Sequence, residues 1–168
     1  MKITAVTPWL IKADWDERPG GDLPRNPTTR EFLFVQVETD AGITGWGEIT
    51  PFPGQVGNRA MHGFVKEVGA LVIGEDPSDI DYIWHKLFRR MTYVGSRGAT
   101  TAAISAIDIA LWDIRGKELG QPIYKLLGGA VRDKIGLYCH PPEPKDPVSA
   151  AIDAKEIVAS GQRAFKFD

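Results

Sequence analysis

The sequence lacks several features that would place it quickly in a class of protein. Its 168 residues include one cysteine, Cys139, which excludes an internal disulfide framework and favours a reducing compartment. No apolar run approaches the ~18–20 residues that span a bilayer. Residues 1–11 mix polar residues with apolar ones and do not resemble a secretory leader. We therefore expect a soluble, cytoplasmic protein.

The chain also lacks an excess of charge of one sign. It carries 20 basic and 22 acidic residues, for a net charge of −2, so no basic surface points to nucleic acid or to an anionic membrane. Walker A, dinucleotide-binding, zinc-binding and nucleophile-elbow motifs are all missing. These absences favour a small molecule or another protein as the partner.

The first fifty residues have the composition of an antiparallel meander. Segments rich in β-branched and aromatic residues predict strands over residues 2–11, 31–39 and 43–49. The sequence Asp40-Ala41-Gly42 is typical of the tight turn between the second and third strands. Polar stretches rich in proline and glycine, at 12–29 and 50–57, predict two long loops.

Helical spacing replaces the alternating pattern after residue 57. Apolar residues three or four apart predict a helix that ends near Gly74, and a second that begins near Pro77 with its apolar stripe in the core. The longest predicted helix covers residues 99–119, is rich in alanine and ends at Gly120. A short helix is expected to begin at Pro122.

The last forty residues predict a strand, a helix and a strand, over 134–140, 148–160 and 164–168. That order is the beginning of a parallel sheet, which is not stable with two strands because both faces and both edges stay open. We therefore expect two domains, 1–128 and 129–168. We also expect that the natural polypeptide continues beyond Asp168.

The helix from Ala103 to Lys117 (AISAIDIALWDIRGK), with Gln121-Pro122-Ile123 and Leu126-Leu127-Gly128 after it, resembles the signature of the mandelate racemase/muconate lactonizing enzyme family of the enolase superfamily. The segments GITGWGE at 42–48 and AFKFD at 164–168 agree with this resemblance. The similarity covers essentially the whole chain.

The resemblance implies a fold and a chemistry. The fold is an α+β capping domain, in which a three-stranded antiparallel meander precedes a helical bundle, followed by the first βαβ unit of a TIM-type (β/α) barrel. The chemistry is Mg²⁺-dependent abstraction of the proton α to a carboxylate. That proton is weakly acidic, so its removal needs concentrated positive charge. The metal ligands are expected beyond Asp168, and the fragment alone is expected to be inactive.

Two residues near the end of the chain are candidate catalytic residues. Lys166 and Asp168 alternate on a predicted strand, so their side chains share one side. They resemble the family's Lys-x-Lys position, with aspartate in place of the second lysine. The resemblance implies that Lys166 binds or polarises the substrate carboxylate. Asp168 is a poor match for the second base of a racemase. The alternative is an exposed amphipathic strand end without a function.

The candidate substrate-binding residues lie in loops and at a strand end. The resemblance places the two long loops over the mouth of the barrel, where a lid would exclude water and select substrates. An arginine there would hold carboxylate or hydroxyl oxygens. Each of these residues has a plainer alternative as a solvated surface or packing residue. The candidates are Trp15, Arg18, Arg25, Thr50, Phe52 and His140.

These features together favour a sugar-acid dehydratase, whose cap selects the substrate. A racemase, epimerase or cycloisomerase of the same family is the first alternative. A stand-alone interaction module is the second, although an open parallel strand would favour aggregation. The expected partner is a carboxylate small molecule, with neither nucleic acid nor membrane, and the resemblance implies a homo-oligomer.

Overall fold

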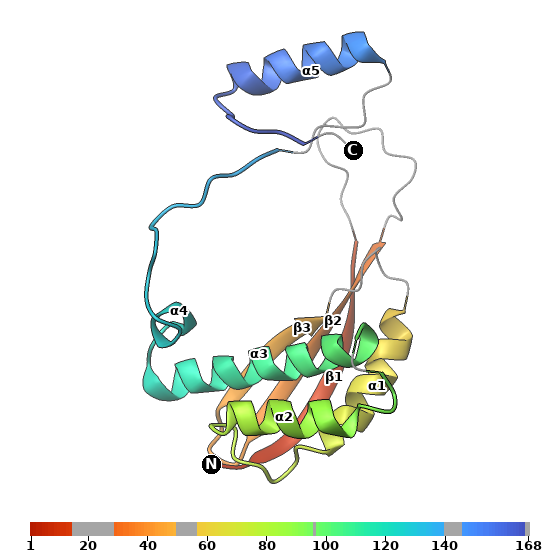
Figure 1. Cartoon of the computed structure of the whole chain (residues 1–168), viewed down its shortest axis with the longest axis vertical. Coiled ribbons are helices and arrows are strands. Elements are labelled where there is room, and N and C mark those ends of the chain that lie inside the picture. The colour runs from red at the N-terminus through yellow and green to blue at the C-terminus, as the bar shows by residue number, and fades with distance from the viewer. Residues whose placement is uncertain (15–28, 50–56, 96, 140–145, 167–168) are drawn as a thin grey trace. The chain divides into compact units, whose positions relative to one another are not determined.

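The computed structural model describes residues 1–14, 29–49, 57–95, 97–139 and 146–166 (Figure 1). These residues belong to two compact units, which divide between Gly129 and Ala130. The first unit holds a sheet and four helices, and the second holds one helix and a short strand pairing.

The sheet of the first unit contains strands β1 (Ile3–Asp14), β2 (Thr29–Thr39) and β3 (Thr44–Ile49), in the order β1-β2-β3. Both pairings are antiparallel, which confirms the predicted meander. Gly42, with φ 74°, forms the tight turn before β3, where its N–H donates to the carbonyl of Thr39 at 3.1 Å. A left-handed residue is required there, and glycine adopts that conformation without strain.

The hairpin arms of β1 and β2 are longer than predicted. The loop was expected to begin at Lys12, yet the register continues through Lys12↔Glu31 to Asp14↔Thr29. An ion pair between the Lys12 ammonium and the Glu31 carboxylate, at 3.3 Å, lies on this extension. Polar residues therefore stay in the ladder because cross-strand pairing compensates for their low strand propensity.

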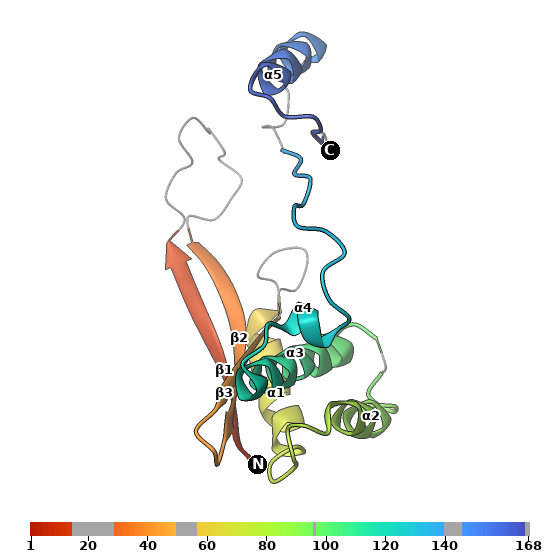
Figure 2. The same ribbon diagram turned by 90° about the vertical axis from the view of Figure 1, so that its left-hand side faces the viewer.

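Four helices follow the sheet in the first unit. They are α1 (Asn58–Ala70), α2 (Ile80–Arg90), α3 (Ala99–Leu119) and α4 (Ile123–Leu126). The bounds of α3 agree with the prediction, and Gly120 ends it in the left-handed conformation with φ 60°. Figure 2 shows α1, α2 and α3 on one side of the sheet.

The core lies between that side of the sheet and the helices. Alternate residues of β2, namely Leu33, Val35 and Val37, are fully buried, as the period of a half-buried strand requires. Helix α2 contributes the stripe that its spacing predicted, with Ile83 and Leu87 buried. The buried residues of α3 are Thr100, Ala103, Ile104, Ala106, Ile107, Ala110, Leu111, Ile114 and Gly116.

Helix α3 packs directly on the backbone of β3. At Gly45 a Cβ atom would overlap the carbonyl oxygen of Ala110, and at Gly47 it would overlap that of Ala106. Small residues on both elements therefore allow the close approach. This contact fixes the direction across the sheet of α3, which contains the family signature and is called the signature helix below.

The second unit contains α5 (Pro147–Ala159) between two segments that meet in parallel at one residue pair, Cys139 and Phe165. The parallel direction agrees with the predicted βαβ unit. The strand expected over 134–140 is not formed at 134–138, where the side chains are exposed. Parallel strands depend on burial of both faces, which these residues do not have.

Candidate functional site

The helix of the second unit begins with a capping box. The Asp146 carboxylate accepts hydrogen bonds from the N–H groups of Val148 and Ser149, at 2.8 and 2.9 Å. The Ser149 hydroxyl in turn accepts one from the N–H of Asp146 at 3.1 Å. Pro147 occupies the first helical position, where no donor is needed. These residues fix the start of α5 within one residue of the prediction.

The backbone of Lys166 is hydrogen-bonded to that of Cys139, on the segment that precedes α5. Its N–H donates to the carbonyl of Cys139 at 3.0 Å, and the N–H of Cys139 donates to the carbonyl of Ala164 at 3.2 Å. The two bonds form one rung of a parallel ladder. The candidate catalytic lysine therefore follows directly after a residue that pairs with the preceding segment.

Of the predicted site residues, the structure describes Lys166 alone, and its side chain is exposed. The other predicted site residues lie outside the described residues, so their roles stay predictions: Trp15, Arg18, Arg25, Thr50, Phe52, His140 and Asp168.

The open edge of β3 is covered by two side chains of the signature helix. The Asp113 carboxylate accepts a hydrogen bond from the N–H of Trp46 at 2.9 Å. Lys117 donates to the carbonyl of Thr44 at 2.7 Å and to Asp113 at 2.6 Å. The backbone groups of Thr44 and Trp46 point toward the free edge, and these bonds satisfy two of them. The signature polar residues are thus structural here.

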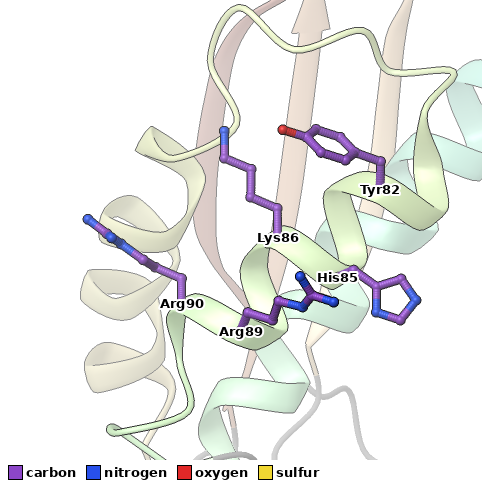
Figure 3. Close-up of a pocket in the computed structure, with 5 residues that line it drawn as sticks. All are labelled: Tyr82, His85, Lys86, Arg89 and Arg90. Atoms are coloured by element: carbon purple, nitrogen blue, oxygen red, sulfur yellow. The ribbon is translucent and has the colours of Figure 1, made fainter.

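A shallow hollow lies along the solvent side of α2, and Figure 3 shows the five side chains that line it. Four of these residues are basic, namely His85, Lys86, Arg89 and Arg90, and the fifth is Tyr82. The Lys86 ammonium forms an ion pair with the Glu75 carboxylate. None of the site residues predicted from the sequence lines this hollow. Helical spacing of solvated charges alone would produce it, so we assign no function to it.

Asp108, on α3, is a half-buried acid of the first unit. Burial raises the pKa of its carboxyl, and the nearby charge of Asp81 on α2 raises it further. The carboxyl of Asp76 shows the opposite effect, because hydrogen bonds from the N–H and hydroxyl of Ser78 lower its pKa. Both groups belong to the first unit, whereas Lys166 belongs to the second.

Metal binding is not supported by the residues that the structure describes. Within the described ranges, no group of three or more histidine, cysteine, aspartate or glutamate side chains could hold a metal ion. The described residues therefore do not fit a Mg²⁺ site, and no chemical step is assigned through one here. Over the same ranges, no helix has the length and apolarity needed to cross a membrane.

Residues 24–128 match the family described as "Mandelate racemase / muconate lactonizing enzyme, N-terminal domain". The matched range is more than half of the 168 residues. One similar protein is a D-galactonate dehydratase of Ralstonia pickettii, 36% identical over 100% of this chain and 38% of its own length. Another is a D-galactonate dehydratase of Xanthomonas euvesicatoria pv. vesicatoria, 47% identical over 82% of this chain and 31% of its own length.

Solved structures agree with this result. A putative dehydratase from Mesorhizobium loti superposes with a TM-score of 0.80 at 33% identity, covering 99% of this chain and 42% of its own. The 3,6-anhydro-D-galactonate cycloisomerase from Zobellia galactanivorans superposes with a TM-score of 0.76 at 28% identity, covering 99% of this chain and 42% of its own. This chain thus spans well under half the length of these proteins.

The described residues define an α+β domain in which an antiparallel three-stranded sheet supports a layer of helices, as in enolase-superfamily proteins. The chain belongs to the mandelate racemase/muconate lactonizing enzyme family, and residues 24–128 form its N-terminal domain. The resemblance drawn from residues 103–117 is therefore confirmed.

Sequence reasoning missed the covering of the β3 edge by Asp113 and Lys117. Their spacing of four residues, acid before base, was a usable sign of a helical ion pair. The contacts to Thr44 and Trp46 join residues 73 and 67 positions apart, so no local pattern predicts them.

Proposed function

We propose that this chain provides the capping domain of a sugar-acid dehydratase, which acts by removing the proton α to the carboxylate of its substrate. The main support is the 36% identity, over the whole chain, to a D-galactonate dehydratase. A hydroxylated acid of this kind presents one carboxylate and several hydroxyl groups. A lid that carries arginine would suit such a substrate.

We further propose residues 129–168 as the beginning of the (β/α) barrel, and Lys166 as its first functional side chain. The parallel pairing of Cys139 with Phe165 and the intervening α5 support this proposal. In barrels of this kind, active sites lie at the carboxyl ends of the strands. Lys166, one residue beyond the pair, would hold the substrate carboxylate by charge. Asp168 would orient Lys166 or accept a hydrogen bond from a substrate hydroxyl.

The proposed cofactor is Mg²⁺, held by residues other than those described here, and the expected assembly is a homo-oligomer. When bound, the ion would supply the positive charge that makes the α-proton acidic. The chain of 168 residues by itself is expected to be inactive. The proposed cap contribution is the lid, with Trp15, Arg18, Arg25, Thr50 and Phe52 against the substrate, while His140 would face it from the first barrel strand.

A library assay tests this function. The protein encoded by the complete reading frame is incubated with Mg²⁺ and a panel of aldonates and aldarates, and 2-keto-3-deoxy products are measured. Turnover of at least one sugar acid is expected. The cycloisomerase among the similar structures makes an isomerase the second candidate. Racemisation or cyclisation of another acid, with no dehydration of any sugar acid, would favour that candidate and refute the dehydratase.

A further inference from the structure

One residue of β2, Glu31, lies where three elements of the first unit meet. Strands β1 and β2 run past the end of β3, whose last residue, Ile49, is paired with Leu33 (Figure 1). Glu31 belongs to this extension, two residues nearer the start of β2. Its carboxylate contacts β1, and its carbonyl contacts α1. Glu31 therefore connects elements that the sheet itself no longer joins.

The contact with β1 is an ion pair with Lys12, which lies directly opposite Glu31 in the register. The Lys12 ammonium is 3.3 Å from the Glu31 carboxylate. The Glu31 side chain is only 14% exposed, whereas that of Lys12 is 59% exposed. A carboxylate with so little access to water depends on a nearby cation. This pair therefore holds the two strands together where they leave the three-stranded part of the sheet.

The contact with α1 is a hydrogen bond from Nδ2 of Asn58 to the carbonyl oxygen of Glu31, at 3.0 Å. Alternate residues of an antiparallel strand direct their backbone groups to the same neighbour, so this carbonyl points to the side of β2 on which β3 lies. Strand β3 ends too early to bind it. The same register would bring Pro51 opposite Glu31, and proline has no N–H to donate. Asn58 thus supplies the donor that the sheet lacks.

The side chain of Asn58 is used for this bond and not for its own helix. Asn58 is the first residue of α1 and is 1% exposed. The N-cap residue is Gly57, and no side chain caps the helix. The Oδ1 atom of Asn58 is buried without a hydrogen-bond donor among the described residues, which costs free energy. An apolar residue of similar volume would avoid that cost, so the Nδ2 bond is what asparagine contributes here.

Helix α1 is itself fixed against the sheet, so its bond to Glu31 has a rigid base. Met61, Val65 and Val68 are buried in the core. A Cβ atom at Gly69 would lie 2.6 Å from Cγ1 of Val6 on β1, so helix and strand are in direct contact. Closely packed elements of this kind transmit a displacement and do not absorb it.

We propose that Lys12, Glu31 and Asn58, here named the stem junction, hold the two loops of the proposed lid in a fixed relation, and that Asn58 is a positioning residue for substrate binding. Lys12 and Glu31 stand at the two ends of the first predicted loop, and Asn58 follows the second. Loss of either contact would let the ends of the two loops move independently. This inference rests on the proposed function, in which both loops cover the substrate.

Hydrogen exchange followed by mass spectrometry, on the protein encoded by the complete reading frame, tests the stem junction without any substrate. Asn58→Leu removes the hydrogen bond and the unpaired Oδ1 together, at similar side-chain volume. We expect residues 10–14 and 29–33 to exchange at least about fivefold faster, whereas Lys66→Ala, exposed on the same helix, should change their exchange by less than about twofold. Unchanged exchange in a folded Asn58→Leu variant would overturn the proposal, whatever reaction the enzyme catalyses.

Steady-state kinetics with the sugar acid that the enzyme dehydrates tests the positioning role. Because the stem junction would set the lid and not the reacting groups, Asn58→Leu should raise KM about tenfold and change kcat by less than about twofold. Glu31→Gln keeps the carbonyl but removes the ion pair, so it should raise KM about threefold. This second variant decides the question if Asn58→Leu does not fold.

Two results of these experiments separate the inference from the function on which it rests. Natural KM values in the folded variants would overturn the positioning role, even if the natural enzyme dehydrates a sugar acid. A natural enzyme that dehydrates no sugar acid would refute the proposed function, and the exchange measurement would then decide by itself whether the stem junction holds the ends of the loops.

Discussion

The Asp113 carboxylate and the Lys117 ammonium lie 2.6 Å apart on successive turns of α3, and both also bind the backbone at the open edge of β3. An unpaired edge invites pairing with other chains. The two side chains therefore attach the signature helix to the sheet and occupy edge groups at the same time. Their contribution to the protein is therefore structural.

Replacing Asp113 by alanine tests this attachment. The variant loses two charge-assisted hydrogen bonds and leaves the N–H of Trp46 without its partner, so we expect unfolding to become easier by about 1–2 kcal/mol. Lys117→Ala should cost less, because its side chain is more exposed. Urea denaturation measures both, and a double-mutant cycle measures their coupling. Wild-type stability of Asp113→Ala would show that the edge contact contributes nothing.

The close contact between β3 and α3 gives a stronger prediction. In Gly47→Ala the new methyl group would overlap the carbonyl oxygen of Ala106, so the helix must shift, and we expect a loss of at least ~2 kcal/mol. Gly63, on the exposed side of α1, has open space around it. Gly63→Ala should stabilise the chain by about 0.5–1 kcal/mol through helix propensity. Thermal denaturation compares the two, and equal effects would contradict the packing described.

The raised pKa of Asp108 predicts a dependence of stability on pH. The folded state favours the protonated form of Asp108. The contribution of this group to the free energy of unfolding is therefore fully present below its pKa in the unfolded chain, and it is lost as the pH rises through its pKa in the folded chain. Asp108→Asn should therefore gain stability relative to the natural chain as pH increases from 3 to 7. Asp81→Asn should give a smaller gain, because burial is the larger cause. Urea titrations at each pH measure this, and a gain that stays constant with pH would refute it.

The capping box of α5 predicts a local effect. Asp146→Ala removes the acceptor for two backbone N–H groups, so the first turn of the helix should open more readily, at a cost of about 1 kcal/mol. Amide hydrogen exchange at Ala150 and its neighbours measures the change directly. Unchanged exchange in this turn would show that Pro147 alone is sufficient to start the helix.

The sequence predicted elements better than it predicted contacts. Helix α3 was predicted at its observed bounds because alanine content, the absence of proline and Gly120 all act locally. The meander followed from alternation and the turn at Gly42. The lengths of β1 and β2 were underestimated, since pairing between Lys12 and Glu31 depends on the partner strand.

The sequence predicted less of the candidate site than of the fold. Lys166 was predicted to lie on a strand over 164–168, and the described residues place it next to the Cys139–Phe165 pair. Its proposed role came from the family resemblance and not from any local physical signal. The roles of Arg18, Arg25 and His140 stay predictions, because these residues lie outside the described ranges.

The proposed role of Lys166 can be tested in the protein encoded by the complete reading frame. If its charge binds the substrate carboxylate, Lys166→Ala should lower kcat/KM for the sugar acid about 100-fold or more. Lys155, exposed on α5, provides a matched lysine, and Lys155→Ala should remain within twofold of the natural enzyme. Equal activity of the two variants would place Lys166 outside the site.

The most direct measurement follows D-galactonate by proton NMR in D₂O with Mg²⁺ and the protein encoded by the complete reading frame. Loss of the signal of the proton α to the carboxylate, together with formation of a 2-keto-3-deoxy acid that carries solvent deuterium at the neighbouring carbon, is the predicted result. An unchanged α-proton signal for D-galactonate and for every other aldonate and aldarate tested would contradict the proposed function.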